Sequence, residues 1–181
     1  MRALLSLFAV ALCLAAGDAS AADPAPPPDN VGLIPGLSPS DARDLLTGLG
    51  VKVENTEFTA GHFIITAAVD PTRHVWLEGL ACSGDGEAAI CPQYKISAHW
   101  ALASHDQAIS VADKLSYSFS SVATDGPNLD LWRMEFVYGG VTREHVRQVL
   151  KAFLILRGDA ADDIWNATHP AAAKAGPPAK P

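Results

Sequence analysis

Residues 75–100 read VWLEGLACSGDGEAAICPQYKISAHW, and they carry the strongest indication of the fold. Two apolar-rich segments, residues 75–82 and 90–100, flank a loop of glycine and small or polar residues, a pattern typical of neighbouring antiparallel strands. Cys82 and Cys91 stand at the two ends of the loop, and in an exported chain they predict a disulfide bridge. The alternative is a pair of buried free thiols.

A bridge at this place would also define which residues of the two strands face each other. If the two cysteines lie opposite each other, opposed residue numbers sum to 173, as 82 and 91 do. Glu78 then faces Lys95 on one side of the sheet, and Gly79 faces Tyr94 in the core. Pro92 has no N–H to donate, so the ladder should fray beside the bridge or place that residue on an outward edge.

Helical and extended patterns alternate around this hairpin. Ser38 and Pro39 begin a first helix, because serine caps an N-terminus and proline fits the first turn, and Gly48 or Gly50 ends it. Further patterns predict strands at residues 51–58, 62–69, 117–124 and 129–138, and helices at residues 105–116 and from Thr142 to Gly158. The order α-β-β-β-β-α-β-β-α indicates an α+β fold, an antiparallel sheet with helices packed on one face.

The first 21 residues have the parts of a secretory signal. Arg2 precedes an apolar run, and Ala19-Ser20-Ala21 forms a small-x-small cleavage site, so the mature chain should begin at Ala22. A membrane anchor is one alternative, but the apolar run of about 14 residues is short of the roughly 20 that cross a bilayer. Lipidation at Cys13 is another, although Leu12 stands where lipoprotein signals require a small residue.

The expected organisation is a signal peptide at 1–21, a Pro-rich linker at 22–32, an α+β domain at 33–166 and a disordered Ala/Pro-rich tail at 167–181. Cleavage near Ala21 predicts a periplasmic or secreted protein with no membrane span in the mature chain. At this length one domain is expected.

Composition excludes several classes of function. The chain has 181 residues, 13 Lys+Arg against 20 Asp+Glu and a net charge of −7. This acidity argues against nucleic acid or an anionic membrane as the main partner, because both attract clustered Lys and Arg. The sequence contains no Rossmann glycine fingerprint, P-loop, zinc ligand set or nucleophile elbow. We therefore expect no cofactor, no bound metal, no catalytic residue and no enzymatic activity.

One charged feature is a candidate binding site. Arg143, Arg147 and Lys151 recur every four residues on the last predicted helix and form a basic stripe in an acidic protein. A solvated helix face is the default interpretation of such a stripe. The functional interpretation is a docking strip for an acidic partner.

Short motifs carry a resemblance to a known family. They are Leu-Ser-Pro-Ser-Asp-Ala-Arg-Asp-Leu-Leu-Thr-Gly-Leu-Gly-Val at 37–51, Gly-Leu-Ala-Cys at 79–82, Ile-Cys-Pro at 90–92 and Met-Glu-Phe-Val-Tyr-Gly-Gly-Val-Thr at 134–142. On these motifs, residues 38–157 resemble the YbjN family, bacterial sensory or regulatory proteins whose fold is similar to that of type III secretion chaperones. The resemblance implies a chaperone-like α+β fold and a binding role without established catalytic residues.

One stretch departs from the family pattern. Family members often carry Trp-Asn in the middle helix and an Arg-Phe pair at the start of the next strand. Residues 112–119 read Ala-Asp-Lys-Leu-Ser-Tyr-Ser-Phe, which matches that pattern only at Phe119. Any role of the unmatched residues is therefore not carried over to this chain.

The sequence predicts an exported, non-enzymatic binding protein, chaperone-like or regulatory, that holds a protein or peptide partner through a sheet face, a strand edge or the last helix. The first alternative is a structural or regulatory envelope subunit that self-associates as a homodimer. The second alternative is a hydrolase whose site has no recognisable motif.

Overall fold

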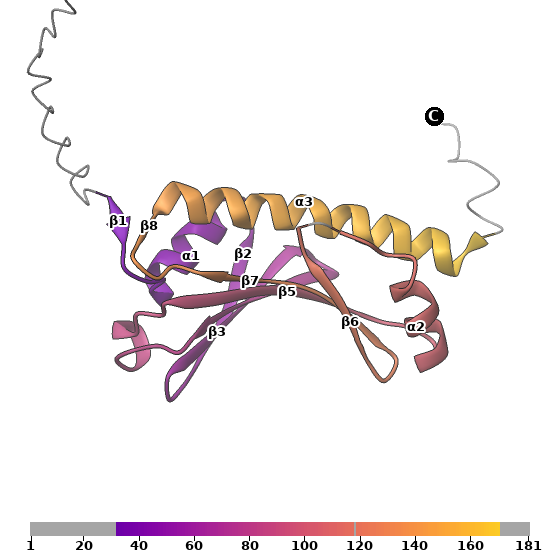
Figure 1. Cartoon of the computed structure of the whole chain (residues 1–181), viewed down its shortest axis with the longest axis horizontal. Helices are drawn as coiled ribbons and strands as arrows, with labels where there is room; N and C mark the ends of the chain where they lie inside the picture. The colour runs from indigo at the N-terminus through magenta and orange to yellow at the C-terminus, as the bar shows by residue number, and fades with distance from the viewer. Residues whose placement is uncertain (1–31, 118, 171–181) are drawn as a thin grey trace, which may run out of the picture. The chain divides into compact units, whose positions relative to one another are not determined.

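A six-stranded antiparallel sheet forms the centre of the fold in the computed structural model, which describes residues 32–117 and 119–170 (Figure 1). Its strands, in spatial order, are β2 (Lys52–Thr59), β3 (His62–Asp70), β4 (Arg73–Leu80), β5 (Gln93–Ala101), β7 (Asn128–Phe136) and β6 (Ser121–Asp125). The predicted α+β class is confirmed. The expected signal peptide, the linker up to residue 31 and the tail from residue 171 lie outside the described residues.

The β4–β5 hairpin has the register predicted from its two cysteines. These cysteines are joined by a disulfide, Glu78 faces Lys95, and Gly79 faces Tyr94. Gly79 and Tyr94 are both buried, as expected for the core side of the hairpin. The β4–β5 ladder ends before Pro92, which cannot donate a hydrogen bond to it.

Two helices pack on one face of the sheet, α1 (Pro39–Gly48) and α3 (Arg143–Thr168), as Figure 1 shows. Alternate side chains of the strands meet them there, because successive residues of a strand point to opposite faces. The largest fully buried side chains of this core include Phe63 of β3, Tyr94 of β5 and Phe153 of α3. The predicted placement of helices on one sheet face is therefore correct for these two elements.

The third helix, α2 (His105–Ala112), packs at the end of the sheet near the C-terminal turns of α3. Val111 of α2 forms a second small core with Leu129 of β7 and Ile164 of α3. The side chain of Ser104 caps the helix by accepting a hydrogen bond from the N–H of Gln107.

Three small elements were not expected from the sequence. Strand β1 (Leu33–Ile34) pairs with β8 (Val141–Thr142), so the entry to α1 lies against the entry to α3. A 3-10 turn, η1 (Gly86–Ala88), lies within the cysteine loop. Pairs of two residues carry too little hydrophobic periodicity for a sequence pattern to reveal them.

Most strand ends lie within three residues of their expected positions, for example Gln93 rather than residue 90 at the start of β5, but three predicted boundaries are wrong by four residues or more. Helix α3 does not end at Gly158 but continues to Thr168, because Ala160 and Ile164 extend its buried stripe past the glycine. This is two residues beyond the expected domain end at 166. Helix α2 ends at Ala112 rather than at residue 116. Beyond Ala112, the N–H groups of Lys114 and Leu115 donate to carbonyl oxygens three residues back, which is the pattern of a tighter turn.

The third wrong boundary concerns β6, which begins at Ser121 and not at Tyr117. The hydroxyl of Tyr117 donates a hydrogen bond to Oδ2 of Asp163 on α3, at 3.0 Å. Arg133 of β7 donates to the carbonyl oxygen of Phe119. The first contact ties Tyr117 to α3, and the second ties Phe119 to the side chain of Arg133, while ladder pairing with β7 begins only at Ser121.

Candidate binding face

The face of the sheet opposite α1 and α3 is the open face, because no described helix covers it. Its rows follow from the strand register. The residues at its centre are Ile64 of β3; Trp76, Glu78 and Leu80 of β4; Gln93, Lys95, Ser97 and His99 of β5; and Asp130, Trp132, Met134 and Phe136 of β7. In Figure 1 the β2–β3 and β6–β7 hairpins bend away from α3 on either side of this face.

Large apolar side chains gather on the β7 side of the open face. Trp132 and Met134 are partly buried, whereas Phe136 is 58% exposed and Tyr138, just beyond β7, is 63% exposed. The rings of Phe136 and Tyr138 stack with their centroids 6.2 Å apart. Together with Trp76 of β4, these residues form the aromatic cluster, an apolar surface of the kind that interaction sites expose.

Ion pairs lie beside the aromatic cluster. Nζ of Lys95 donates to Oε1 of Glu78 at 2.9 Å, and the side chains of both residues are mostly buried. Nε2 of His62 lies 3.5 Å from the other oxygen of Glu78. The pair predicted from the cysteine register is therefore a real contact, and it places two opposite charges beside the apolar side chains of the open face.

A serine, a histidine and an aspartate form a chain on the open face. Nε2 of His99 lies 3.4 Å from Oγ of Ser97, and Nδ1 of His99 contacts Oδ1 of Asp130 on the neighbouring strand. The residue order matches a serine hydrolase triad. Ser97, however, is fully buried in the middle of a central strand, whereas a nucleophile must be exposed on a turn with N–H donors aimed at the reacting oxygen.

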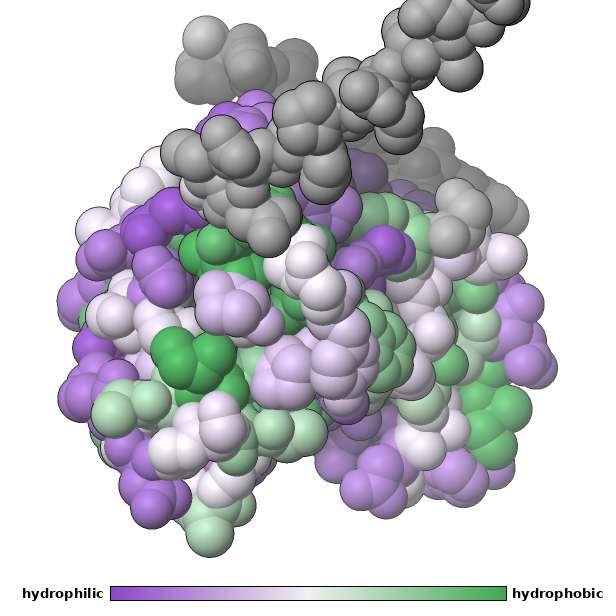
Figure 2. Space-filling view, turned by 60° about the vertical axis from the view of Figure 1, so that its left-hand side comes forward, coloured by the Kyte–Doolittle hydropathy of each residue, from purple (hydrophilic) through white to green (hydrophobic). Residues whose placement is uncertain are grey.

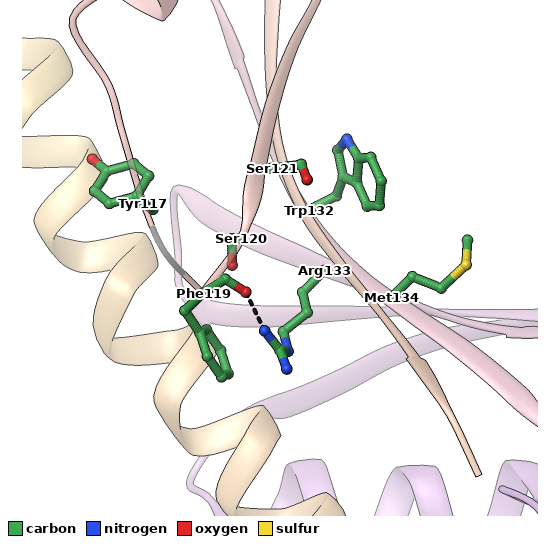
Figure 3. A pocket seen from close by; sticks show the side chains of 7 residues that line it. All are labelled: Tyr117, Phe119, Ser120, Ser121, Trp132, Arg133 and Met134. Atoms are coloured by element: carbon green, nitrogen blue, oxygen red, sulfur yellow. Dashed lines mark hydrogen bonds between the residues drawn. The ribbon is translucent and has the colours of Figure 1, made fainter. Parts of the chain in front are cut away.

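A pocket opens where β6 and β7 separate (Figure 3). It has a volume of about 280 Å³ and is lined by Tyr117, Phe119, Ser120, Ser121, Trp132, Arg133 and Met134. Figure 3 shows Trp132 and Met134 on one side of β7, and Arg133 with Phe119 on the other. We call this space the fork pocket. Burial, followed by the hydrogen bond to Asp163, raises the pKa of the Tyr117 phenol, so its hydroxyl stays a donor at neutral pH.

The predicted basic stripe is not a row of free cations. Arg143 pairs with Asp41 and with Asp44, both on α1. Arg147 pairs with Glu144 on its own helix, which lowers the pKa of that carboxyl group to about 2. Lys151 is exposed one turn further on. Arg143 thus ties α3 to α1, and only part of the stripe faces solvent without an ion partner among the residues described.

At the end of the molecule that carries β1 and η1, the exposed apolar residues are dispersed and do not form one cluster. Figure 2 shows small hydrophobic patches interspersed with hydrophilic residues in the coloured part of that surface. Elsewhere on the helices, Ile155 is 59% exposed and Trp165 is 55% exposed. The aromatic cluster differs from these single residues because Tyr138 stacks on Phe136 and the other members lie on β4 and β7 of one sheet.

The described residues contain neither a metal-binding cluster nor a membrane-spanning helix. Among residues 32–117 and 119–170, no three His, Cys, Asp or Glu side chains gather as a metal ion would require. Within the same residues, no helix is both long enough and apolar enough to cross a bilayer. Comparison with family models, curated proteins and solved structures finds no match to this chain.

Proposed function

We propose that this chain is an exported, non-enzymatic binding protein that holds a protein or peptide partner on the open face of its sheet. The observation that carries the proposal is the asymmetry of the sheet. Helices α1 and α3 bury one face, while the other displays the aromatic cluster beside the Glu78–Lys95 pair. Exposing large aromatic side chains to water is unfavourable, so a surface of this composition is best explained by a partner that covers it.

Two further features support the location and the role. The disulfide between Cys82 and Cys91 is the kind of bond that persists outside the reducing cytoplasm, and it agrees with the secretory pattern of residues 1–21. The resemblance to the YbjN family, with its chaperone-like fold, supports a binding role of the protein or peptide kind.

The test is site-specific photo-crosslinking in intact cells. A photo-reactive phenylalanine analogue replaces Phe136 or Tyr138 on the open face, and Ile155 or Trp165 on α3 as matched controls of similar exposure. We expect crosslinked species from the two open-face positions and none from the two helix positions. Equal crosslinking from both sets would contradict the proposal. A crosslink to a second copy of the chain would support the self-associating envelope subunit instead.

The Ser97–His99–Asp130 chain is the one observation that favours a hydrolase. This alternative predicts that a fluorophosphonate probe labels the wild-type protein and does not label Ser97→Ala. Absence of labelling in the wild type, with the open-face crosslinks present, would support the binding protein. The burial of Ser97 leads us to expect that outcome.

A further inference from the structure

One edge of strand β7 is paired along the whole strand, and the other edge is paired along only part of it. Its first half lies between β5 and β6, but β6 reaches only as far as the pair Ser121–Trp132. Beyond that point β7 continues to Phe136 with β5 on one side. On the other side, none of the described strands accompanies it.

The backbone groups that face this gap can be identified. The N–H of Val137 donates to the carbonyl oxygen of Pro92 at 2.9 Å, so it points toward β5. Because backbone groups alternate in direction along a strand, those of Arg133 and Glu135 also point toward β5. The N–H and C=O groups of Met134 and Phe136 therefore point into the gap. They form the β7 slot, which offers two donors and two acceptors to an incoming strand.

The chain's own segment does not fill the slot. Opposed residues of β6 and β7 sum to 253, so Phe119 would face Met134 if β6 were longer. Instead Phe119 lies under Arg133, whose guanidinium carbon is 3.7 Å from the centre of the phenyl ring. The hydrogen bond from Tyr117 to Asp163 holds the segment against α3. The fork pocket is the space left between this segment and β7.

Two of the six buried side-chain polar atoms without a partner among the described residues lie at the same place. Oγ of Ser120 and Nε of Arg133 are buried and have no hydrogen-bond partner within residues 32–117 and 119–170. Buried donors and acceptors without partners are rare in native proteins, since each costs free energy. Both residues line the fork pocket. A ligand with a peptide backbone could pair with both atoms, because each of its residues carries a C=O acceptor and an N–H donor.

The other edges of the sheet are protected against strand pairing. Strand β2 carries Lys52, Glu54 and Glu57 and has an irregular register between Val53 and Asn55. Strand β6 has five residues. Charges, bulges and shortness are the usual devices that prevent an edge from recruiting another strand. The β7 slot differs from these edges because it carries Met134 and Phe136 on the open face and because β7 runs in unbroken register with β5 on its other side.

We propose that the β7 slot takes one extended peptide segment of a partner protein as an added strand, in the manner of strand addition at other sheet edges. The inference rests on the proposed binding function and names how the partner is held. Alternate residues of the segment would be apolar, because they lie beside Met134, Phe136 and Trp132 on the open face. The intervening residues would be polar, because they approach Arg133 and Glu135 on the other side.

The partner must supply free N–H groups. Residues 22–30 of the chain itself contain four prolines and could not form a regular ladder. A segment of another protein with alternating apolar and polar residues satisfies both the backbone and the side chains. A second copy that pairs β7 with β7 is an alternative occupant, and it would appear as a dimer by light scattering.

The first test uses amide hydrogen exchange read by NMR on the mature protein. The probe is the peptide acetyl-Lys-Val-Thr-Val-Thr-Val-Lys-amide, and its control is the same peptide with alternate backbone nitrogens methylated. In the free protein, the amides of Met134 and Phe136 should exchange faster than those of Arg133 and Glu135. Saturating probe should slow the first two by about tenfold or more, and the methylated control should leave them unchanged.

The second test compares two variants at one position. Phe136→Ala removes the ring and keeps the N–H, whereas Phe136→Pro also removes the N–H that points into the slot. Because β5 does not use that N–H, the proline variant should keep its fold, as circular dichroism would show. We expect the proline variant to bind the probe about tenfold more weakly than the alanine variant.

The outcomes separate this inference from the proposed function. Unprotected Met134 and Phe136 amides in the presence of saturating probe, or equal binding by the two variants, would overturn strand addition. If the open-face crosslinks are still found in that case, the binding function stands and the partner is held by side chains alone. A concentration-dependent dimer with those amides already protected would assign the slot to a second copy and overturn the partner-peptide inference.

Discussion

Replacing Gly79 and Gly158 with alanine should change stability in opposite directions. Gly79 lies in β4 with Phe63 beside it on β3 and Tyr94 beside it on β5, and both aromatic residues are fully buried. A Cβ at Gly79 would overlap the ring of Phe63 and would lie 2.6 Å from Sγ of Cys91. A Cβ at Gly158 in α3 would meet nothing within 4 Å.

The magnitudes follow from these surroundings. Overpacking a filled core costs about 1 to 3 kcal/mol, and the upper value applies because the disulfide holds Cys91 and the core encloses Phe63. Replacing glycine with alanine raises the free energy of unfolding by about 0.5 to 1 kcal/mol, because alanine restricts the unfolded backbone. Gly79→Ala should therefore lose about 2 kcal/mol. Gly158→Ala should gain about 0.5 to 1 kcal/mol, because only the second effect operates in an open helix position.

Urea unfolding of the oxidised variants, followed by circular dichroism, measures both effects. The reasoning also predicts that Phe63→Leu costs less in the Gly79→Ala background than in the wild type, because a smaller side chain relieves the overlap. If Gly79→Ala is as stable as Gly158→Ala, the space beside Gly79 is not filled as described, and the argument from the cysteine hairpin to a tight core is wrong.

Three further predictions concern the bridge, the basic stripe and pH. Replacing Cys82 and Cys91 with alanine should cost about 2 to 3 kcal/mol, since the bridge closes a loop with a sequence separation of 9; equal thermal stability of the two forms would refute this. Arg143→Glu should cost about 1 kcal/mol, because a carboxylate would then face two aspartates of α1. Arg147→Glu should leave stability close to that of the wild type in the same thermal melts, because the ion partner of Arg147 lies on α3 itself. Burial, and then the charge of a nearby glutamate, raises the pKa of the Tyr94 phenol above the value of about 10 for an unfolded tyrosine. Its contribution to stability is therefore full below pH 10 and is lost as the pH rises above that value, so phenolate absorbance of Tyr94 should appear only together with unfolding.

The cysteine hairpin could be read from the sequence because its constraints are local. A bridge between two residues nine apart leaves one register for the strands that it joins, and alternation then assigns each side chain to a face. Glu78 and Lys95 meet for that reason. The helix starts were equally readable, because Ser38, Ser104 and Thr142 each cap the helix that follows with their own side chains.

The fork between β6 and β7 could not be read in that way. The residues after Tyr117 have the composition of a strand, and a strand was expected from residue 117. Its actual start at Ser121 depends on contacts with Asp163 and Arg133, which are 46 and 14 residues away from their partners in the chain. No local pattern encodes such contacts.

Sequence patterns are enough to predict the α+β class, the hairpin register and the stripe of Arg143, Arg147 and Lys151, because each depends on periodicity or on a short covalent loop. The tertiary structure alone decided which face of the sheet the helices leave open and that Arg143 is paired with α1. It also decided that Met134 and Phe136 lie at an unpaired edge. These properties arise when distant segments compete for the same surface, and that competition is settled only by packing the whole chain.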